Sequence, residues 1–109
     1  MMDDTKAEKA LSWLTDNASK AAKARATREY LSEYRKSLKA ILMASAPGDS
    51  VAAKEMAAYA DPRYTAHLDA LRMAIEDDER FRWLQVAAEA VIEVWRTGQA
   101  NQRAQAKIG

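Results

Sequence analysis

Apolar residues recur at intervals of three and four along most of this chain, which is the spacing of one face of an α-helix. Only three glycines and two prolines interrupt the 109 residues, too few for the frequent turns of a β-sandwich or barrel. The pattern therefore predicts an all-α fold. The apolar positions that follow this spacing are Ala7, Ala10, Leu11 and Leu14; Leu31, Tyr34, Leu38, Ile41, Leu42 and Ser45; and Tyr64, Leu68, Leu71 and Ile75.

The first predicted helix spans residues 5–46. Thr5 with Glu8 three residues later forms a capping box, in which each side chain satisfies a free amide at the helix start. Thr15, Asp16 and Asn17 are poor helix formers. We expect a kink near residues 15–17, or a gap between a short helix and a long one.

The sequence Ala46-Pro47-Gly48-Asp49 is the strongest turn signal in the chain. Pro47 ends the first helix, Gly48 permits a positive φ, and Asp49 or Ser50 caps a second helix over residues 50–60.

A third helix is predicted over residues 62–97. Asp61 is its N-cap, Pro62 occupies the first helical position, and Gly98 is its expected end. Residues 1–98 are expected to form one helical domain, followed by a polar C-terminal tail over residues 99–109 that either frays or stays helical.

Two long helical arms around one tight turn predict an antiparallel hairpin, in which residue i faces roughly residue 97 − i. The formal net charge of +1 conceals an asymmetry between the arms. Residues 20–39 hold seven basic and two acidic side chains, whereas residues 66–93 hold seven acidic and three basic ones. The simplest interpretation is that the oppositely charged arms attract each other, with residues 20–28 opposite residues 72–77.

The segment 83–95 is apolar around most of its circumference, because its polar residues Gln85, Glu89 and Glu93 share one narrow stripe. One partner arm covers only one side of such a helix. We therefore expect self-association into a helical bundle, with a dimer favoured, and a folded-back N-terminal helix as the alternative. The candidate interface residues are Trp83, Leu84, Ala87, Val91, Val94 and Trp95.

Two charged clusters are candidate binding surfaces. The first is basic and is a candidate for contacts with nucleic-acid phosphates, with Tyr30 and Tyr34 one turn apart as candidates for base stacking. The second is acidic, and its simplest interpretation is a solvated face paired with Arg80 and Arg82. The clusters comprise Lys20, Lys23, Arg25 and Arg28, and Glu76, Asp77, Asp78 and Glu79, respectively.

No pattern in the sequence indicates catalysis. The chain has no cysteine, no glycine-rich phosphate loop and a single histidine, His67, without a second ligand one turn away. We therefore expect no enzyme activity, no metal and no cofactor. The absence of a long apolar run and of an apolar leader predicts a cytoplasmic protein without a membrane span.

The strings ALSWLTD (residues 10–16), AAYADPRY (57–64) and IEVWR (92–96) resemble a family of small uncharacterised all-helical bacteriophage proteins. Members of that family are encoded near DNA-recombination genes, such as those of single-strand annealing proteins. The resemblance implies a phage origin, a bacterial host cell and a part in phage DNA metabolism. It supplies no catalytic residues.

The function expected from the sequence is that of a non-catalytic phage accessory protein of DNA recombination or replication. It would act through protein–protein contacts, with a phage recombinase or a host DNA-processing protein as partner, and contact with single-stranded DNA is a further expectation. One alternative is a small inhibitor of a host defence or DNA-processing enzyme, whose basic groove the acidic cluster would occupy. Another is a purely structural helical oligomer.

Overall fold

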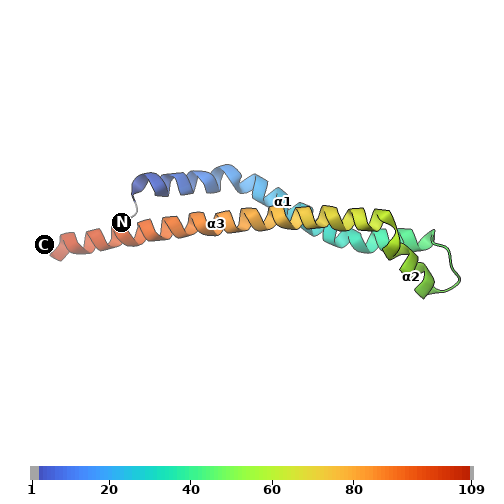
Figure 1. Ribbon diagram of the computed structural model, residues 1–109. Helices are drawn as coiled ribbons and strands as arrows, with labels where there is room; N and C mark the ends of the chain where they lie inside the picture. Colours follow the sequence, from blue (N-terminus) through green and yellow to red (C-terminus); the bar gives the residue numbers. More distant parts are fainter. Residues whose placement is uncertain (1–2, 109) are drawn as a thin grey trace. The chain divides into compact units, whose positions relative to one another are not determined.

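The computed structural model describes residues 3–108, which form three helices and no strand (Figure 1). These are α1 (Asp4–Ala44), α2 (Val51–Ala60) and α3 (Pro62–Ile108), so the predicted all-α class is confirmed. The described residues group into two compact units. We call residues 3–22 with 80–108 the terminal unit, and Lys23–Glu79 the turn unit. The single domain expected over residues 1–98 stays a prediction.

The start of α1 differs from the prediction. The Asp3 carboxylate accepts a hydrogen bond from the Lys6 amide at 2.9 Å, so Asp3 caps the helix in place of Thr5. Of the two alternatives predicted near residues 15–17, a kink or a gap, the gap is wrong, because α1 is one unbroken helix there. Thr15 and Asn17 donate side-chain hydrogen bonds to carbonyl oxygens of the preceding turn, at 3.0 and 2.9 Å, which accommodates these polar residues inside the helix.

The turn between α1 and α2 follows the sequence signals. Gly48 has a φ of 120°, and a Cβ added there would lie 2.9 Å from the Cβ of Ala53, so only glycine fits without strain. Ser50 caps α2, since its hydroxyl accepts a hydrogen bond from the Ala53 amide at 3.0 Å. The cap and the positive φ are both confirmed.

Asp61 starts α3 as predicted. One carboxylate oxygen accepts the Arg63 amide at 2.8 Å, and the other lies 2.9 Å from the Arg63 guanidinium. Hydrogen bonds from the side chain and then the backbone of Arg63 lower the pKa of Asp61, so the charged form that caps the helix is favoured.

The end of α3 is not where the sequence predicted it. The helix continues through Gly98 to Ile108, so the expected end at Thr97 is wrong and the tail is helical up to residue 108. Among the residues the structure describes, only Gly48 has a positive φ. Gly98 thus sits inside the helix, where a lone glycine costs about 1 kcal/mol without ending it. The alanines and glutamines that follow sustain the helix.

In the turn unit, α1 and α3 pair antiparallel, and α2 covers their end next to the turn. Leu42, Leu71 and Ala74 are buried, and α2 contributes the buried Ala58. His67 is also buried, and its Nε2 donates a hydrogen bond to the Leu31 carbonyl oxygen at 2.7 Å.

The core of the turn unit corrects four sequence expectations. The residues that were expected on the apolar faces, yet are exposed, are Tyr34, Ile41, Ser45 and Leu68. A spacing of three and four allows two neighbouring rows on one helix, and only the row that meets the other helix becomes buried. On α3 that row runs through His67 and Leu71.

In the terminal unit, small residues form the buried contact. Ala7 and Ala10 of α1 and Ala88 of α3 are buried, and the rings of Trp13 and Phe81 lie 6.5 Å apart. Trp95 donates its indole N–H to the Asp4 carboxylate at 2.7 Å. These contacts run antiparallel and stay within about one turn of the predicted register. Arg28 of the turn unit departs further: the register placed residue 69 opposite it, but it reaches Asp78 and Glu79.

Leu42 and its neighbour Ile41 offer a matched test of this packing. Leu42 is 2% exposed, and Ile41 is 54% exposed. We expect Leu42→Ala to lower the free energy of unfolding by about 2–4 kcal/mol, through lost burial and the cavity left behind. Ile41→Ala should cost under about 1 kcal/mol. Denaturant unfolding at one fixed protein concentration measures both, and equal losses would contradict the packing described.

Candidate functional site

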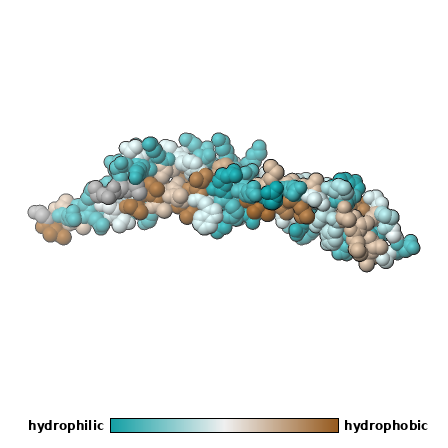
Figure 2. Space-filling view, in the orientation of Figure 1, coloured by the Kyte–Doolittle hydropathy of each residue, from teal (hydrophilic) through white to brown (hydrophobic). Residues whose placement is uncertain are grey.

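The exposed apolar surface of α3 in the terminal unit is the most prominent feature that the fold leaves uncovered. Phe81, Ala88, Ile92 and Trp95 lie on the face that meets α1, all buried or half-buried. A second row occupies a different face, because its members are offset from the first by one or two residues. This outward row comprises Trp83, Ala87, Ala90 and Val94, all exposed. Figure 2 shows apolar side chains, in brown, at the molecular surface among polar ones.

The outward row has large side chains at both ends and alanines between them. Trp83 is 62% exposed and Val94 is 54% exposed, far more than is usual for core residues of their size. Leu84 and Val86, at 44% and 46%, widen the exposed apolar surface on either side. The intervals of four, three and four residues between row members are those of a coiled-coil seam.

The predicted interface residues fall into two groups. Trp83, Leu84, Ala87 and Val94 are exposed, whereas Val91 and Trp95 are half-buried within the unit. The sequence interpretation also missed Ala90 and Val86, which complete the exposed surface. The four-three-four spacing from Trp83 to Val94 was the signal that identifies Ala90.

A polar stripe runs beside the outward row, as the sequence predicted. Gln85 donates to Glu89 at 3.2 Å, and Arg96 pairs with Glu93 at 3.2 Å. These pairs lie one turn apart on exposed helix surface, where each stabilises the helix by only about 0.2–0.5 kcal/mol. The stripe therefore keeps one face of α3 solvated and limits the width of the apolar surface.

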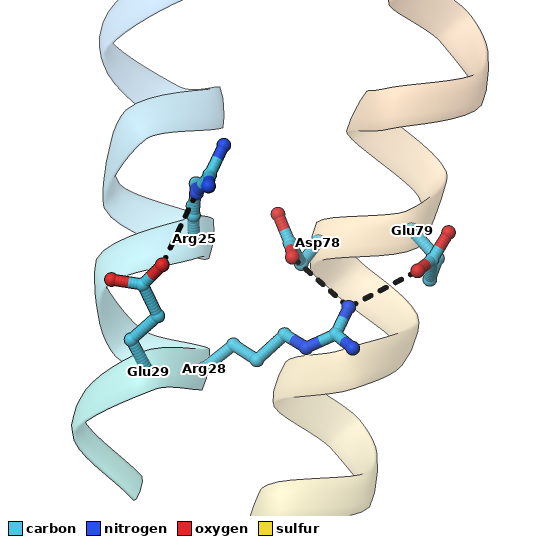
Figure 3. Close-up of polar contacts among 5 residues, drawn as sticks. All are labelled: Arg25, Arg28, Glu29, Asp78 and Glu79. Carbon is cyan, nitrogen blue, oxygen red and sulfur yellow. Dashed lines mark hydrogen bonds and ion pairs between the residues drawn. The ribbon is translucent and has the colours of Figure 1, made fainter. Parts of the chain in front are cut away.

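The basic cluster is partly neutralised. Within the turn unit, the Arg28 guanidinium bridges Asp78 and Glu79 of α3, at 3.1 Å from each (Figure 3). Arg25 pairs with Glu29 one turn along α1, at 3.2 Å. Hydrogen bonding to Glu79, opposed in part by desolvation, raises the pKa of Arg28, which stays charged. Two members of the cluster thus already contact carboxylates.

The other two members are different. Lys20 of the terminal unit and Lys23 of the turn unit are both exposed, and among residues 3–108 neither makes an ion pair. Tyr30, two turns after Lys23 and so on the same face, is 66% exposed. Its ring stacks on that of Tyr34, with centroids 5.9 Å apart and planes inclined by 14°.

Most side chains of the acidic cluster form ion pairs with arginines of the chain itself. Asp78 and Glu79 hold Arg28, and Glu76 pairs with Arg72 at 3.2 Å. The attraction between oppositely charged arms that the sequence suggested is seen at Arg28, which joins α1 to Asp78 and Glu79 of α3. The sequence also predicted that the acidic cluster pairs with Arg80 and Arg82 on the same helix.

Within the described part of the chain, no three His, Asp or Glu side chains lie close enough together to hold a metal ion. His67 faces the Leu31 carbonyl and the Tyr34 ring, with ring centroids 5.6 Å apart. Over residues 3–108, no helix combines the length and apolarity that a bilayer crossing requires.

Comparison with known proteins yields no match among protein-family models, curated proteins or solved structures. The geometry of the chain's own residues therefore carries the functional argument.

A double-mutant cycle tests the bridge at Arg28. We expect Arg28→Gln and Asp78→Asn each to lower the free energy of unfolding, with a coupling energy that falls as salt rises. Arg25→Gln with Glu29→Gln is the matched control, because this pair is more exposed and lies on one helix. Denaturant unfolding at low and high salt measures both cycles. A coupling at Arg28 no larger than that at Arg25 would show that the bridge does not link the helices.

Proposed function

We propose that this chain is a non-catalytic helical protein that acts through protein–protein contacts, and that it self-associates as a dimer through the outward row of α3. The observation that carries the proposal is the exposure of Trp83 and Val94 on a face that the chain's own helices do not cover.

Burial of this row is worth a substantial amount of free energy. A tryptophan buries about 150–250 Å² when covered, and apolar area contributes about 25 cal/mol per Å². Trp is also among the residues enriched at the energetic centres of interfaces. Trp83 and Val94 are thus positioned to dominate an interface, while Ala87 and Ala90 between them permit close approach of a second helix.

The biological setting of the proposal rests on the resemblance to small phage proteins encoded beside recombination genes. On that basis we propose that the chain acts in the cytoplasm of a bacterial host cell and takes part in phage DNA recombination or replication. A phage recombinase or a host DNA-processing protein is the partner proposed there. The inhibitor alternative receives less support, because Glu76, Asp78 and Glu79 are engaged by the chain's own arginines.

The dimer is tested by molar mass. We expect the wild-type chain to have the mass of a dimer at micromolar concentration in light scattering. Trp83→Ala should raise the dimer Kd by roughly thirtyfold or more, since loss of one interface tryptophan costs about 2 kcal/mol and each of the two copies loses one. The matched control is Met73→Ala, which removes an exposed apolar side chain from the turn unit.

Circular dichroism of each variant checks that the helices are intact. A monomeric wild type at tens of micromolar would refute the proposal. So would a Trp83→Ala chain that dimerises as tightly as the wild type.

Contact with single-stranded DNA is a second candidate function, favoured by the exposed tyrosine stack beside the unpaired Lys23. Base stacking on an aromatic side chain contributes about 1–3 kcal/mol per base. Both features lie in the turn unit and do not involve the outward row.

We expect a fluorescent oligothymidylate to bind weakly at low salt, and Tyr30→Ala and Lys23→Glu each to weaken that binding. Lys36→Glu is the matched control: it makes the same charge change at an exposed lysine six residues from Tyr30, on another face of α1. Anisotropy titrations measure the affinity. Absence of binding in low salt, or equal effects of both charge reversals, would dismiss this candidate.

A further inference from the structure

The outward row reads almost the same in both directions. Its side chains run large, small, small, large, from Trp83 through Ala87 and Ala90 to Val94. The intervals of four, three and four residues are also unchanged on reversal. A two-fold symmetric contact requires a surface that is complementary to a reversed copy of itself, and this row meets that requirement.

We infer that the row's partner is a second copy of this chain running antiparallel, with the two-fold axis passing between Ala87 and Ala90. This inference rests on the proposed self-association and specifies its geometry. Trp83 packs on the partner's Val94, and Ala87 packs on the partner's Ala90. Alanines at the centre allow the helix axes to approach to about 8 Å, the short end of the usual range.

The residues flanking the row favour the same orientation. One flank holds the apolar Leu84 and Val91, and the other combines Val86 with the charged Glu93 and, further out, Arg82. In an antiparallel helix pair each flank meets the same flank of the other copy, whereas in a parallel pair the two different flanks meet. The antiparallel arrangement therefore joins the flank of Leu84 and Val91 to its own copy, whereas a parallel pair sets it against the flank that carries Glu93.

Charge supports this arrangement twice. Antiparallel packing brings Arg82 close to the partner's Glu93, because these positions lie on the same flank and within two residues of each other in the reversed register. A parallel pair instead places Arg80, which precedes Trp83 by one interval of three, on the partner's Arg80. Like charges facing each other across a seam oppose association.

Cysteine cross-linking distinguishes the two orientations without background, since the chain has no cysteine of its own. Arg80 and Thr97 extend the outward row by three residues at each end, and both are exposed. In the antiparallel dimer Arg80 lies opposite the partner's Thr97. The two copies of Thr97 are then about 25 Å apart, given 1.5 Å per residue along a helix. A disulfide needs Cα atoms within about 7 Å.

Arg80→Cys and Thr97→Cys chains are oxidised separately and as an equimolar mixture, then analysed on a non-reducing gel. We expect a covalent dimer in the mixture and none in either variant alone. Arg103→Cys, exposed on α3 beyond the outward row, is the control for random collision and should not cross-link. Light scattering of each reduced variant verifies that it still dimerises.

Covalent dimers in the separate variants would mean parallel chains, which overturns this inference while the proposed self-association stands. Dimeric mass without any cross-link would place the interface elsewhere and overturn the geometry. Monomeric mass for the wild type would instead overturn the proposed function itself.

Discussion

A pair of helices covers only one face of each member, and this constraint governs what the chain exposes. In the terminal unit, α3 turns Ala88 and the half-buried Trp95 towards α1. Its sequence is apolar on a second face as well, so Trp83 and Val94 stay in solvent. Large apolar side chains in that position favour association, because no rearrangement within a two-helix pair covers both faces at once.

The polar contacts between helices fix the alignment of α1 on α3 more than they add to the free energy of unfolding. Arg28 with Asp78 and Glu79 is half-exposed, and such pairs contribute little net stability. The pair forms only when α1 and α3 are aligned as observed, however, so a shifted alignment loses it, at a cost of about 1 kcal/mol or less at such half-exposed positions. The hydrogen bond from buried His67 to the Leu31 carbonyl acts in the same way within the turn unit. Alanine-rich faces need such devices, because small side chains fit together in several alignments.

Local signals in the sequence predicted the local structure well. Gly48, Ser50 and Asp61 each act through their own backbone or the next turn, and each does in the structure what the sequence indicated. Gly98 misled because a glycine ends a helix only where the chain needs a positive φ, and the residues after it favour helix. Thr5 was a wrong prediction because Asp3, two residues earlier, offers an equally good cap.

Which apolar row faces inward was beyond the sequence for a different reason. Tyr34 and Leu38 both satisfy helical spacing, and burial depends on where α3 lies, which is a property of the pair. The same ambiguity affected the interface: Val91 and Trp95 were grouped with Trp83 because the whole segment is apolar. Once the inward row is known, the outward row follows as the apolar positions left over. The structure thus separates the inward row from the outward row, which the apolar composition of the segment 83–95 does not distinguish. The near-symmetric order of side chains is visible only in the outward row.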